Sequence, residues 1–291
     1  MKKVICILIV AAILCTAALA LASCDSSAPS GSPPAASTPA DNAPADSTPA
    51  AAARLICGVT EYEPMNFRDV NGNWTGFDTE FALLVGERLG MEVEFQMIEW
   101  ANKFVELNSG AIDAIWNGFT ATANEPDGTP RITLCDMSYS YMLNTQSIVI
   151  RANRTGEFTS EDDLIGKSLA VESGSAGDAK AANLVGDSGS VIGAAAQINT
   201  FLEVMTGAAD GAIIDLILAQ QLVGTGDYSD LAIADIDLGH EVFAIGFRTG
   251  DPLRDRVNEV IRELYDEGAL LEIAQKYDLE QRLVLDLAFG R

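Results

Sequence analysis

The sequence is poor in basic residues, with 18 Lys and Arg against 42 Asp and Glu and a formal net charge of −24. So acidic a chain repels polyanions, which excludes nucleic-acid binding. It has one histidine, His240, and the polar stretch Gly239-His240-Glu241 predicts a solvated loop residue. General acid–base catalysis usually needs a positioned histidine or a carboxyl group of raised pKa, so the composition favours a binding protein over an enzyme.

Cysteine is also scarce, with five in the whole chain, and three of these lie in the first 24 residues. Cys57 and Cys135 remain as a potential pair, but two ordinary half-buried thiols are the preferred interpretation. No spacing of the cysteines supports a metal site. We therefore predict neither a metal nor a cofactor.

The N-terminus begins with Lys2 and Lys3, followed by an apolar run from Val4 to Leu21. This pattern is typical of a secretory signal peptide, which we place at residues 1–23. The run is also long enough to span a bilayer, so an uncleaved membrane anchor is the alternative.

A second segment, up to Ala53, contains six of the ten prolines and has no aromatic residue, Lys or Arg. Such a composition cannot bury enough apolar area to offset the entropy lost on ordering. Residues 24–53 are therefore predicted to be a disordered tether.

The remaining residues, 54–291, are more than one compact domain usually holds, so two lobes are expected. Alternating strand and helix patterns predict an α/β fold in which each lobe is a mostly parallel sheet flanked by helices. We assign 54–147 and 245–291 to lobe 1 and 148–244 to lobe 2, joined by a two-stranded hinge. The predicted strands are 54–59, 93–97, 111–116, 146–150, 168–172, 212–214 and 242–247, and the predicted helices are 78–89, 100–108, 176–185, 198–205, 216–223 and 251–267.

The predicted strand that starts at Ala111 ends at Trp116 in a small polar loop, Asn117-Gly118-Phe119-Thr120. Strand ends of this kind are where α/β proteins bind ligands. Asp215 follows another apolar strand in the same way, where a carboxylate is costly to bury without a partner. It is either the partner of a ligand ammonium group or a helix N-cap, or both.

Several segments in this order resemble the type II periplasmic, or extracellular, solute-binding proteins of amino-acid ABC transporters (solute-binding protein family 3). The resemblance covers about 54 to 280 and implies a two-lobed periplasmic binding protein type II fold. Leu21-Ala22-Ser23-Cys24 is similar to a bacterial lipobox, which implies lipidation of Cys24. The segments that carry the resemblance are 64–67, 76–78, 100, 112–120, 167–175, 209–215 and 244–251.

The family has an arginine shortly after the strand-end loop, and a planar guanidinium is the best single clamp for a carboxylate. In this sequence Glu125 occupies the expected position, where it would repel the carboxylate of a ligand. We interpret 125–130 as an insertion that loops out, so that Arg131 is the clamp. The alternative is that Arg131 is a surface residue.

The resemblance also implies that Asp215 binds the α-amino group of the ligand. Ser173-Gly174-Ser175-Ala176 lies between a strand and a helix, so its amides and the Ser175 hydroxyl could hold the carboxylate from the second lobe. This stretch lacks the spacing of a phosphate-binding loop.

Tyr62, Trp100 and Trp116 are candidates to line the side-chain pocket, with core packing as the alternative for each. Glu61, Glu63 and Asn102 lie nearby in sequence and could set the side-chain preference. A carboxylate in the pocket would favour a cationic amino acid, whereas Asn and Thr alone would suit a polar neutral one. The predicted ligand-binding residues are Arg131, Asp215, Thr120, Gly118, Asn117, Ser175, Ala176, Tyr62, Trp100 and Trp116.

The resemblance implies a monomeric, lipid-anchored receptor on the outer face of the cell membrane. It would bind a polar or charged L-amino acid and deliver it to an ABC transporter permease. A sensory module of a signalling system, or a dehydratase-like enzyme on the same fold, are the alternatives.

Overall fold

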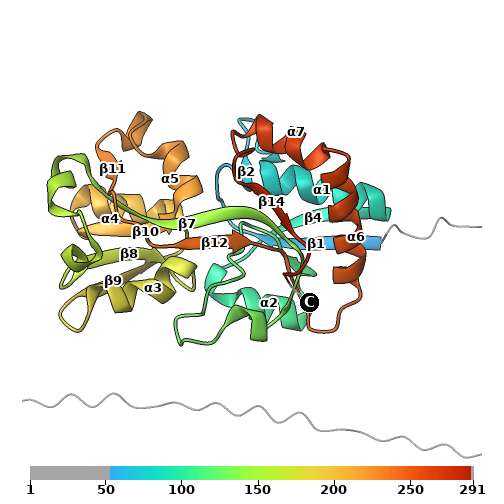
Figure 1. The fold of residues 1–291 in the computed structure, drawn as a ribbon, viewed down its shortest axis with the longest axis horizontal. Coiled ribbons are helices and arrows are strands. Elements are labelled where there is room, and N and C mark those ends of the chain that lie inside the picture. Colours follow the sequence, from blue (N-terminus) through green and yellow to red (C-terminus); the bar gives the residue numbers. More distant parts are fainter. Residues whose placement is uncertain (1–52, 290–291) are drawn as a thin grey trace, which may run out of the picture. The chain divides into compact units, whose positions relative to one another are not determined.

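The computed structural model describes residues 53–289, which fold into two lobes, each built on its own β-sheet (Figure 1). The predicted signal peptide, the lipidation site Cys24 and the tether to residue 52 lie outside the described residues. Within the described part of the chain, no helix has the length and apolar character needed to cross a membrane.

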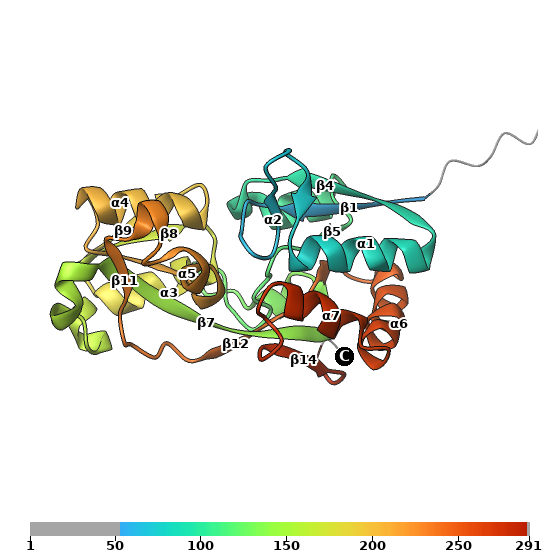
Figure 2. The same cartoon turned by 90° about the horizontal axis from the view of Figure 1, so that it is seen from above.

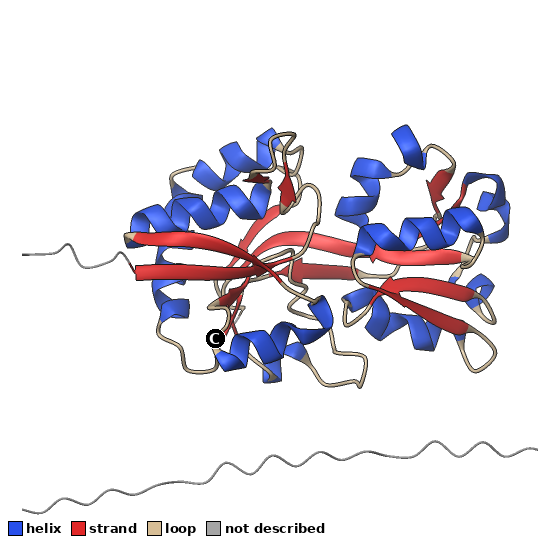
Figure 3. Cartoon of the chain, turned by 180° about the vertical axis from the view of Figure 1, so that it is seen from behind, coloured by secondary structure: helices blue, strands red, loops and turns tan. Residues whose placement is uncertain are grey.

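Lobe 1 is built on a five-stranded sheet in the order β4-β1-β5-β13-β6. The strand β1 is parallel to β4 and β5, whereas β13 is antiparallel to its neighbours β5 and β6. Helices cover the sheet on both faces (Figure 3). The strands are β1 (Ala53–Val59), β4 (Met91–Met97), β5 (Ala114–Ile115), β6 (Asp136–Met137) and β13 (Gly246–Phe247), and the helices are α1 (Phe77–Leu89), α2 (Lys103–Ser109), α6 (Leu253–Asp266) and α7 (Ala269–Lys276).

Lobe 2 is built on the order β11-β7-β10-β8-β9, in which β8 is parallel to both β9 and β10. The strand β7 is antiparallel to β10 and β11. The strands are β7 (Ser140–Arg151), β8 (Ser168–Glu172), β9 (Ser190–Ala194), β10 (Gly211–Asp215) and β11 (Leu231–Ile233), and the helices are α3 (Ala176–Val185), α4 (Thr200–Thr206) and α5 (Leu216–Leu222).

Two extended segments run between the lobes, β7 and the antiparallel strand β12 (His240–Phe243) beside it (Figure 2). The C-terminal half of β7 pairs in the lobe 2 sheet, while its N-terminal half pairs with β12 and with β14 (Leu283–Asp286). Both connections between the lobes therefore lie in one antiparallel ribbon, formed by β7 and β12. The two remaining strands of the described residues, β2 (Phe67–Arg68) and β3 (Trp74–Thr75), pair with each other in a small antiparallel hairpin.

The buried face predicted for the long helix near the C-terminus is confirmed. The residues predicted to be buried on α6, Leu253, Val257, Val260, Ile261 and Leu264, all lie in the core. Asp251 accepts a hydrogen bond from the Leu253 amide at 2.9 Å, so its side chain satisfies one of the free N–H groups at the start of this helix.

The predicted N-cap role of Asp78 is wrong. The helix α1 begins one residue earlier, with Gly76 at the cap position, and Asp78 is fully buried. Its carboxylate accepts hydrogen bonds from the Gly118 amide at 2.6 Å and from the Tyr141 hydroxyl at 3.0 Å. Asp78 therefore links α1 to the loop that contains Gly118, and it does not cap the helix.

The predicted strand 242–247 is interrupted. Its first part belongs to β12, beside β7, and its last two residues form β13 in the lobe 1 sheet. The predicted strand 111–116 is reduced to Ala114–Ile115, and the predicted helix 100–108 begins as a 3₁₀ turn, Trp100–Asn102, before α2.

Cys57 and Cys135 are free thiols, and both are buried rather than half-buried as expected. Burial raises the pKa of the Cys135 thiol to about 12. A thiol held protonated in this way is a poor nucleophile, which agrees with a packing role.

Candidate functional site

A small cavity lies where the two lobes face each other. Residues from both sheets line it, so neither lobe forms it alone. Nine of the ten residues proposed from the sequence as ligand-binding are among its lining. The lining residues are Tyr62, Trp100, Asn117, Gly118, Thr120, Arg131, Glu172, Ser175, Ala176, Gln197 and Asp215.

The lobe 1 side of the cavity is the loop that follows β5. The Asn117 side chain is held by Thr60, whose amide and hydroxyl donate to Asn117 Oδ1 at 3.0 and 2.7 Å. Gly118 has φ +54°, and a Cβ there would lie 2.5 Å from the Tyr62 ring. Only glycine fits this position. Because its amide donates to Asp78, that N–H is not available to a ligand.

Arg131 is 1% exposed, so it is a buried residue of the cavity and not a surface residue. It starts a 3₁₀ turn, Arg131–Thr133, directly after Pro130. Its Nε donates to Glu125 Oε1 at 2.7 Å, Nη1 to the Thr120 carbonyl at 3.0 Å and Nη2 to the Gly174 carbonyl at 2.9 Å. A guanidinium has five N–H donors, so two remain, one on each terminal nitrogen.

Glu125 does not loop out with the rest of the insertion. The loop 125–130 closes on itself, with the Glu125 amide donating to the Thr129 carbonyl at 2.8 Å, but the Glu125 carboxylate turns inward. It bridges Arg131 and Lys103, whose Nζ lies 2.8 Å from Glu125 Oε2. We expected the Glu125 carboxylate to repel the carboxylate of a ligand. The positive charge of Lys103, which the sequence did not reveal as part of the site, offsets this repulsion.

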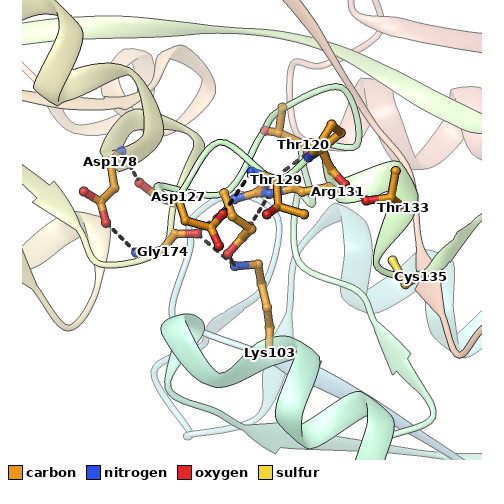
Figure 4. A network of polar contacts seen from close by, with 12 residues as sticks. Lys103, Thr120, Asp127, Thr129, Arg131, Thr133, Cys135, Gly174 and Asp178 are labelled. Atoms are coloured by element: carbon orange, nitrogen blue, oxygen red, sulfur yellow. Dashed lines mark hydrogen bonds and ion pairs between the residues drawn. The ribbon is translucent and has the colours of Figure 1, made fainter.

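Lys103 is fully buried and also donates to the Gly174 carbonyl, at 2.9 Å. Burial and the nearby Arg131 charge lower the pKa of Lys103 to about 8. In Figure 4, Lys103 and Arg131 reach toward Gly174, which belongs to the other lobe. Two lobe 1 cations thus share one lobe 2 carbonyl oxygen.

The lobe 2 side includes the N-terminus of α3. The Ser175 hydroxyl accepts from the Asp178 amide at 3.0 Å, as an N-cap does, and Asp178 accepts from the Gly174 amide at 2.8 Å. Ser175 and Ala176 line the cavity at the positive end of the helix dipole. This arrangement favours an anionic group of a ligand.

Asp215 follows β10 directly and is 5% exposed. Its Oδ1 accepts from Asn144 at 2.5 Å and from Gln146 at 2.7 Å, and its Oδ2 accepts from Gln197 at 2.5 Å. Asp215 occupies the N-cap position of α5, as the alternative predicted, but its side chain makes no capping hydrogen bond to that helix. Burial and the charge of Glu241 raise the pKa of Asp215 to about 6, against the opposing effect of the three amide donors.

Two of the three proposed aromatic residues line the cavity. Tyr62 and Trp100 do so, whereas Trp116 packs against Phe81 in the core, with ring centroids 5.1 Å apart. None of the proposed preference-setting residues Glu61, Glu63 and Asn102 is among the lining residues. The Trp116 proposal is corrected in favour of core packing, because its ring is fully buried and packs against a residue of α1.

Sequence reasoning missed Glu172 and Gln197, which both line the cavity. Gln197 fixes Asp215 from two sides, since its Oε1 also accepts from the Asp215 amide at 2.8 Å. Glu172 is a polar residue at the end of an apolar strand, and that position was the available signal. Among residues 53–289, no cluster of three His, Cys, Asp or Glu side chains could hold a metal ion.

The fold and the two-sided cavity define a periplasmic binding protein of type II. Residues 55–280 match the family model of bacterial extracellular solute-binding proteins, family 3, and the chain belongs to that family. It is 26% identical over 227 residues to the arginine-binding extracellular protein ArtP of Bacillus subtilis, covering 77% of this chain and 86% of ArtP.

Two solved structures of binding proteins are also similar to this chain. A substrate-binding protein of an ABC uptake transporter from Streptococcus pneumoniae, with bound histidine, is 31% identical with a TM-score of 0.69, over 77% of this chain and 92% of that one. The ancestral amino-acid-binding protein AncCDT-1, described as a precursor of cyclohexadienyl dehydratase, is 26% identical with a TM-score of 0.67, over 77% and 95% of the two chains.

Proposed function

We propose that this protein is an extracytoplasmic receptor that binds an L-amino acid between its lobes and delivers it to the permease of an ABC transporter. The observation that carries the proposal is the pairing, in one cavity, of a site for an anion with a buried carboxylate. Arg131 and the start of α3 form the first, and Asp215 is the second. An amino acid carries a carboxylate and an ammonium group on one carbon, so it needs both.

The polar contacts divide these roles. Arg131 keeps two free N–H donors, which suits bidentate binding of the α-carboxylate. The three amides around Asp215 hold its carboxylate in place, and a ligand ammonium would supply the positive charge that this buried group lacks. The rings of Tyr62 and Trp100 would cover the rest of the ligand.

A thermal-shift panel over the common L-amino acids tests the proposal. At a ligand concentration of about 100 Kd, binding stabilises the folded state by about 2.7 kcal/mol, so a ligand is readily detected. Arg131→Ala and Asp215→Ala should each lower affinity by roughly a hundredfold or more. Arg154→Ala is the control, because that arginine pairs with Glu157 and Asp210 instead of lining the cavity.

Stabilisation by no amino acid would refute the ligand class, and full affinity in Arg131→Ala would refute its role as the clamp. Recovery of the ligand chemically unchanged separates a receptor from a dehydratase-like enzyme. The ABC transporter, rather than a sensory partner, is supported by the transport relatives. Uptake of the ligand by cells with and without the gene distinguishes the two.

We also propose a lipid anchor at Cys24, which lies outside the described residues, and a monomeric state. Metabolic labelling with a fatty acid, lost in Cys24→Ala, tests the anchor. Sedimentation of residues 54–291 tests the monomer.

A further inference from the structure

Glu172 is a buried carboxyl group with one oxygen that lacks a hydrogen-bond partner among the described residues. It ends β8, is 3% exposed and lines the cavity. Its Oε1 is inaccessible to solvent, and no residue from 53 to 289 forms a hydrogen bond with it. Natural proteins rarely leave such a group unsatisfied, so each one requires an explanation.

The cations near Glu172 are already engaged. Lys103 and Arg131 share the carboxylate of Glu125 and the carbonyl of Gly174. Asp215, the other carboxylate lining the cavity, adds a second negative charge near Glu172, and its own hydrogen bonds come from neutral amides. Lys180 pairs with Glu241 at 2.9 Å and adds no net charge.

Counting formal charges, the cavity and its bridging pair hold two cations, Lys103 and Arg131, against the carboxylates of Glu125, Glu172 and Asp215. With a zwitterionic ligand whose side chain is neutral, this excess of one negative charge stays in place or Glu172 must take up a proton. A ligand with one additional positive charge removes the excess. Burying an uncompensated charge is costly, so the closed cavity is best matched to the second kind of ligand.

We infer that Glu172 is the specificity-determining residue of the site and receives a cationic side chain, so that the substrate class is the basic L-amino acids. This inference rests on the proposed function. Tyr62 and Trp100 line the same cavity and suit such a ligand, because aromatic faces attract cations. Burial and the Asp215 charge raise the pKa of Glu172 to about 8, and the nearby charges of Lys103 and Arg131 offset this rise only in part.

Calorimetric titration of residues 54–291 with L-arginine and L-citrulline tests the inference, because citrulline replaces the guanidinium by a neutral urea of nearly the same shape. The wild-type domain should bind arginine roughly a hundredfold more tightly than citrulline, the scale of a buried charge pair. Glu172→Gln, which keeps shape and removes charge, should reduce that ratio to less than about tenfold.

Glu99→Gln is the matched control. Glu99 is exposed and close enough to act on Glu172 electrostatically, so this change removes a nearby charge outside the cavity lining. It should leave the ratio unchanged. L-Lysine against L-norleucine gives a second pair of ligands that differ by a side-chain ammonium group.

The outcomes separate this inference from the proposed function. Tight binding of neutral amino acids with no preference for arginine or lysine overturns the role of Glu172 while leaving the receptor intact. An unchanged ratio in Glu172→Gln, with the variant still folded by circular dichroism, also overturns it. Binding of no amino acid at all overturns the proposed function itself.

Discussion

Local sequence predicted some residues of the site but not those whose role depends on partners distant in the chain. Arg131, Asp215 and Ser175 were proposed from motif spacing and chemical type, and all three line one cavity. The role of Asp78 could not be read in this way, because its partners Gly118 and Tyr141 are distant in sequence. For Glu172 one signal was present in the sequence, its position at the end of an apolar strand, but only the structure shows that its Oε1 lacks a hydrogen-bond partner.

The affinity for a basic ligand should depend on pH through Glu172. Its pKa is raised to about 8 in the absence of ligand, whereas a cationic side chain binds only the ionised carboxylate. Binding therefore expels a proton below about pH 8, and affinity should rise by up to about tenfold per pH unit from about pH 6 to 8. Calorimetry with arginine across this range measures the slope.

Titratable groups near Glu172 limit the pH range over which this dependence should hold. Asp215, with a pKa of about 6, should weaken binding further at lower pH, while loss of the Lys103 proton near pH 8 changes the charge above it. Arg131 and exposed Glu99 also act on Glu172. Glu172→Gln should flatten the slope and Glu99→Gln should not. An equal slope in wild type and Glu172→Gln would assign the pH dependence to another group.

At the scale of elements, regular segments were predictable and junctions were not. The bounds predicted for β8 and α3 agree with the structure, because an apolar run before Ser-Gly-Ser and a capped helix are local patterns. The segment 242–247 was predicted as one strand, but its two ends pair with different sheets. Apolar periodicity indicates that a segment is extended, not which sheet it joins.

Loop 125–130, which we interpret as an insertion relative to the family pattern, has a structural role through Glu125. Glu125 is the only carboxylate within ion-pair distance of Lys103 or Arg131 among the described residues. Glu125→Gln leaves these buried cations without a carboxylate at ion-pair distance, which should destabilise the ligand-free domain by about 3 kcal/mol. Differential scanning fluorimetry should show a lower melting temperature, by roughly 5 to 10 °C.

A second substitution makes this prediction specific. Lys103→Met in the Glu125→Gln background removes one of the two cations that lost their ion-pair partner and should restore much of the lost stability. A ligand carboxylate should also compensate the missing charge, so the ligand-induced shift should be larger in Glu125→Gln than in wild type. If Glu125→Gln melts at the wild-type temperature, the bridge contributes nothing to stability.

At the scale of the whole molecule, hydrogen bonds across the cavity connect the two lobes. Lys103 and Arg131 of lobe 1 donate to the Gly174 carbonyl of lobe 2, and these bonds exist only while the lobes are together. The two segments that connect the lobes lie in one antiparallel ribbon, which permits hinge closure. The sequence predicted two lobes from the restart of the α/β pattern, but the facing surfaces come from many separate segments.

Gly174 limits how closely the lobes approach. A Cβ at this position would lie 2.9 Å from Ala101 Cα, a backbone atom of the opposite lobe, and its φ of +75° disfavours other residues. Gly174→Ala should therefore oppose closure and weaken ligand binding by about tenfold or more. Gly72→Ala is the control, with φ +83° and no atom within 4 Å of the added Cβ.

Small-angle scattering distinguishes lost closure from local strain. The radius of gyration of the wild-type domain should fall when the ligand is added, because the ligand stabilises the closed form. In Gly174→Ala the ligand should produce a smaller decrease, whereas Gly72→Ala should behave like wild type even if both variants lose similar stability. Equal compaction in Gly174→Ala and wild type would mean that the lobes close without the Gly174–Ala101 approach, and that Gly174 serves only the turn before α3.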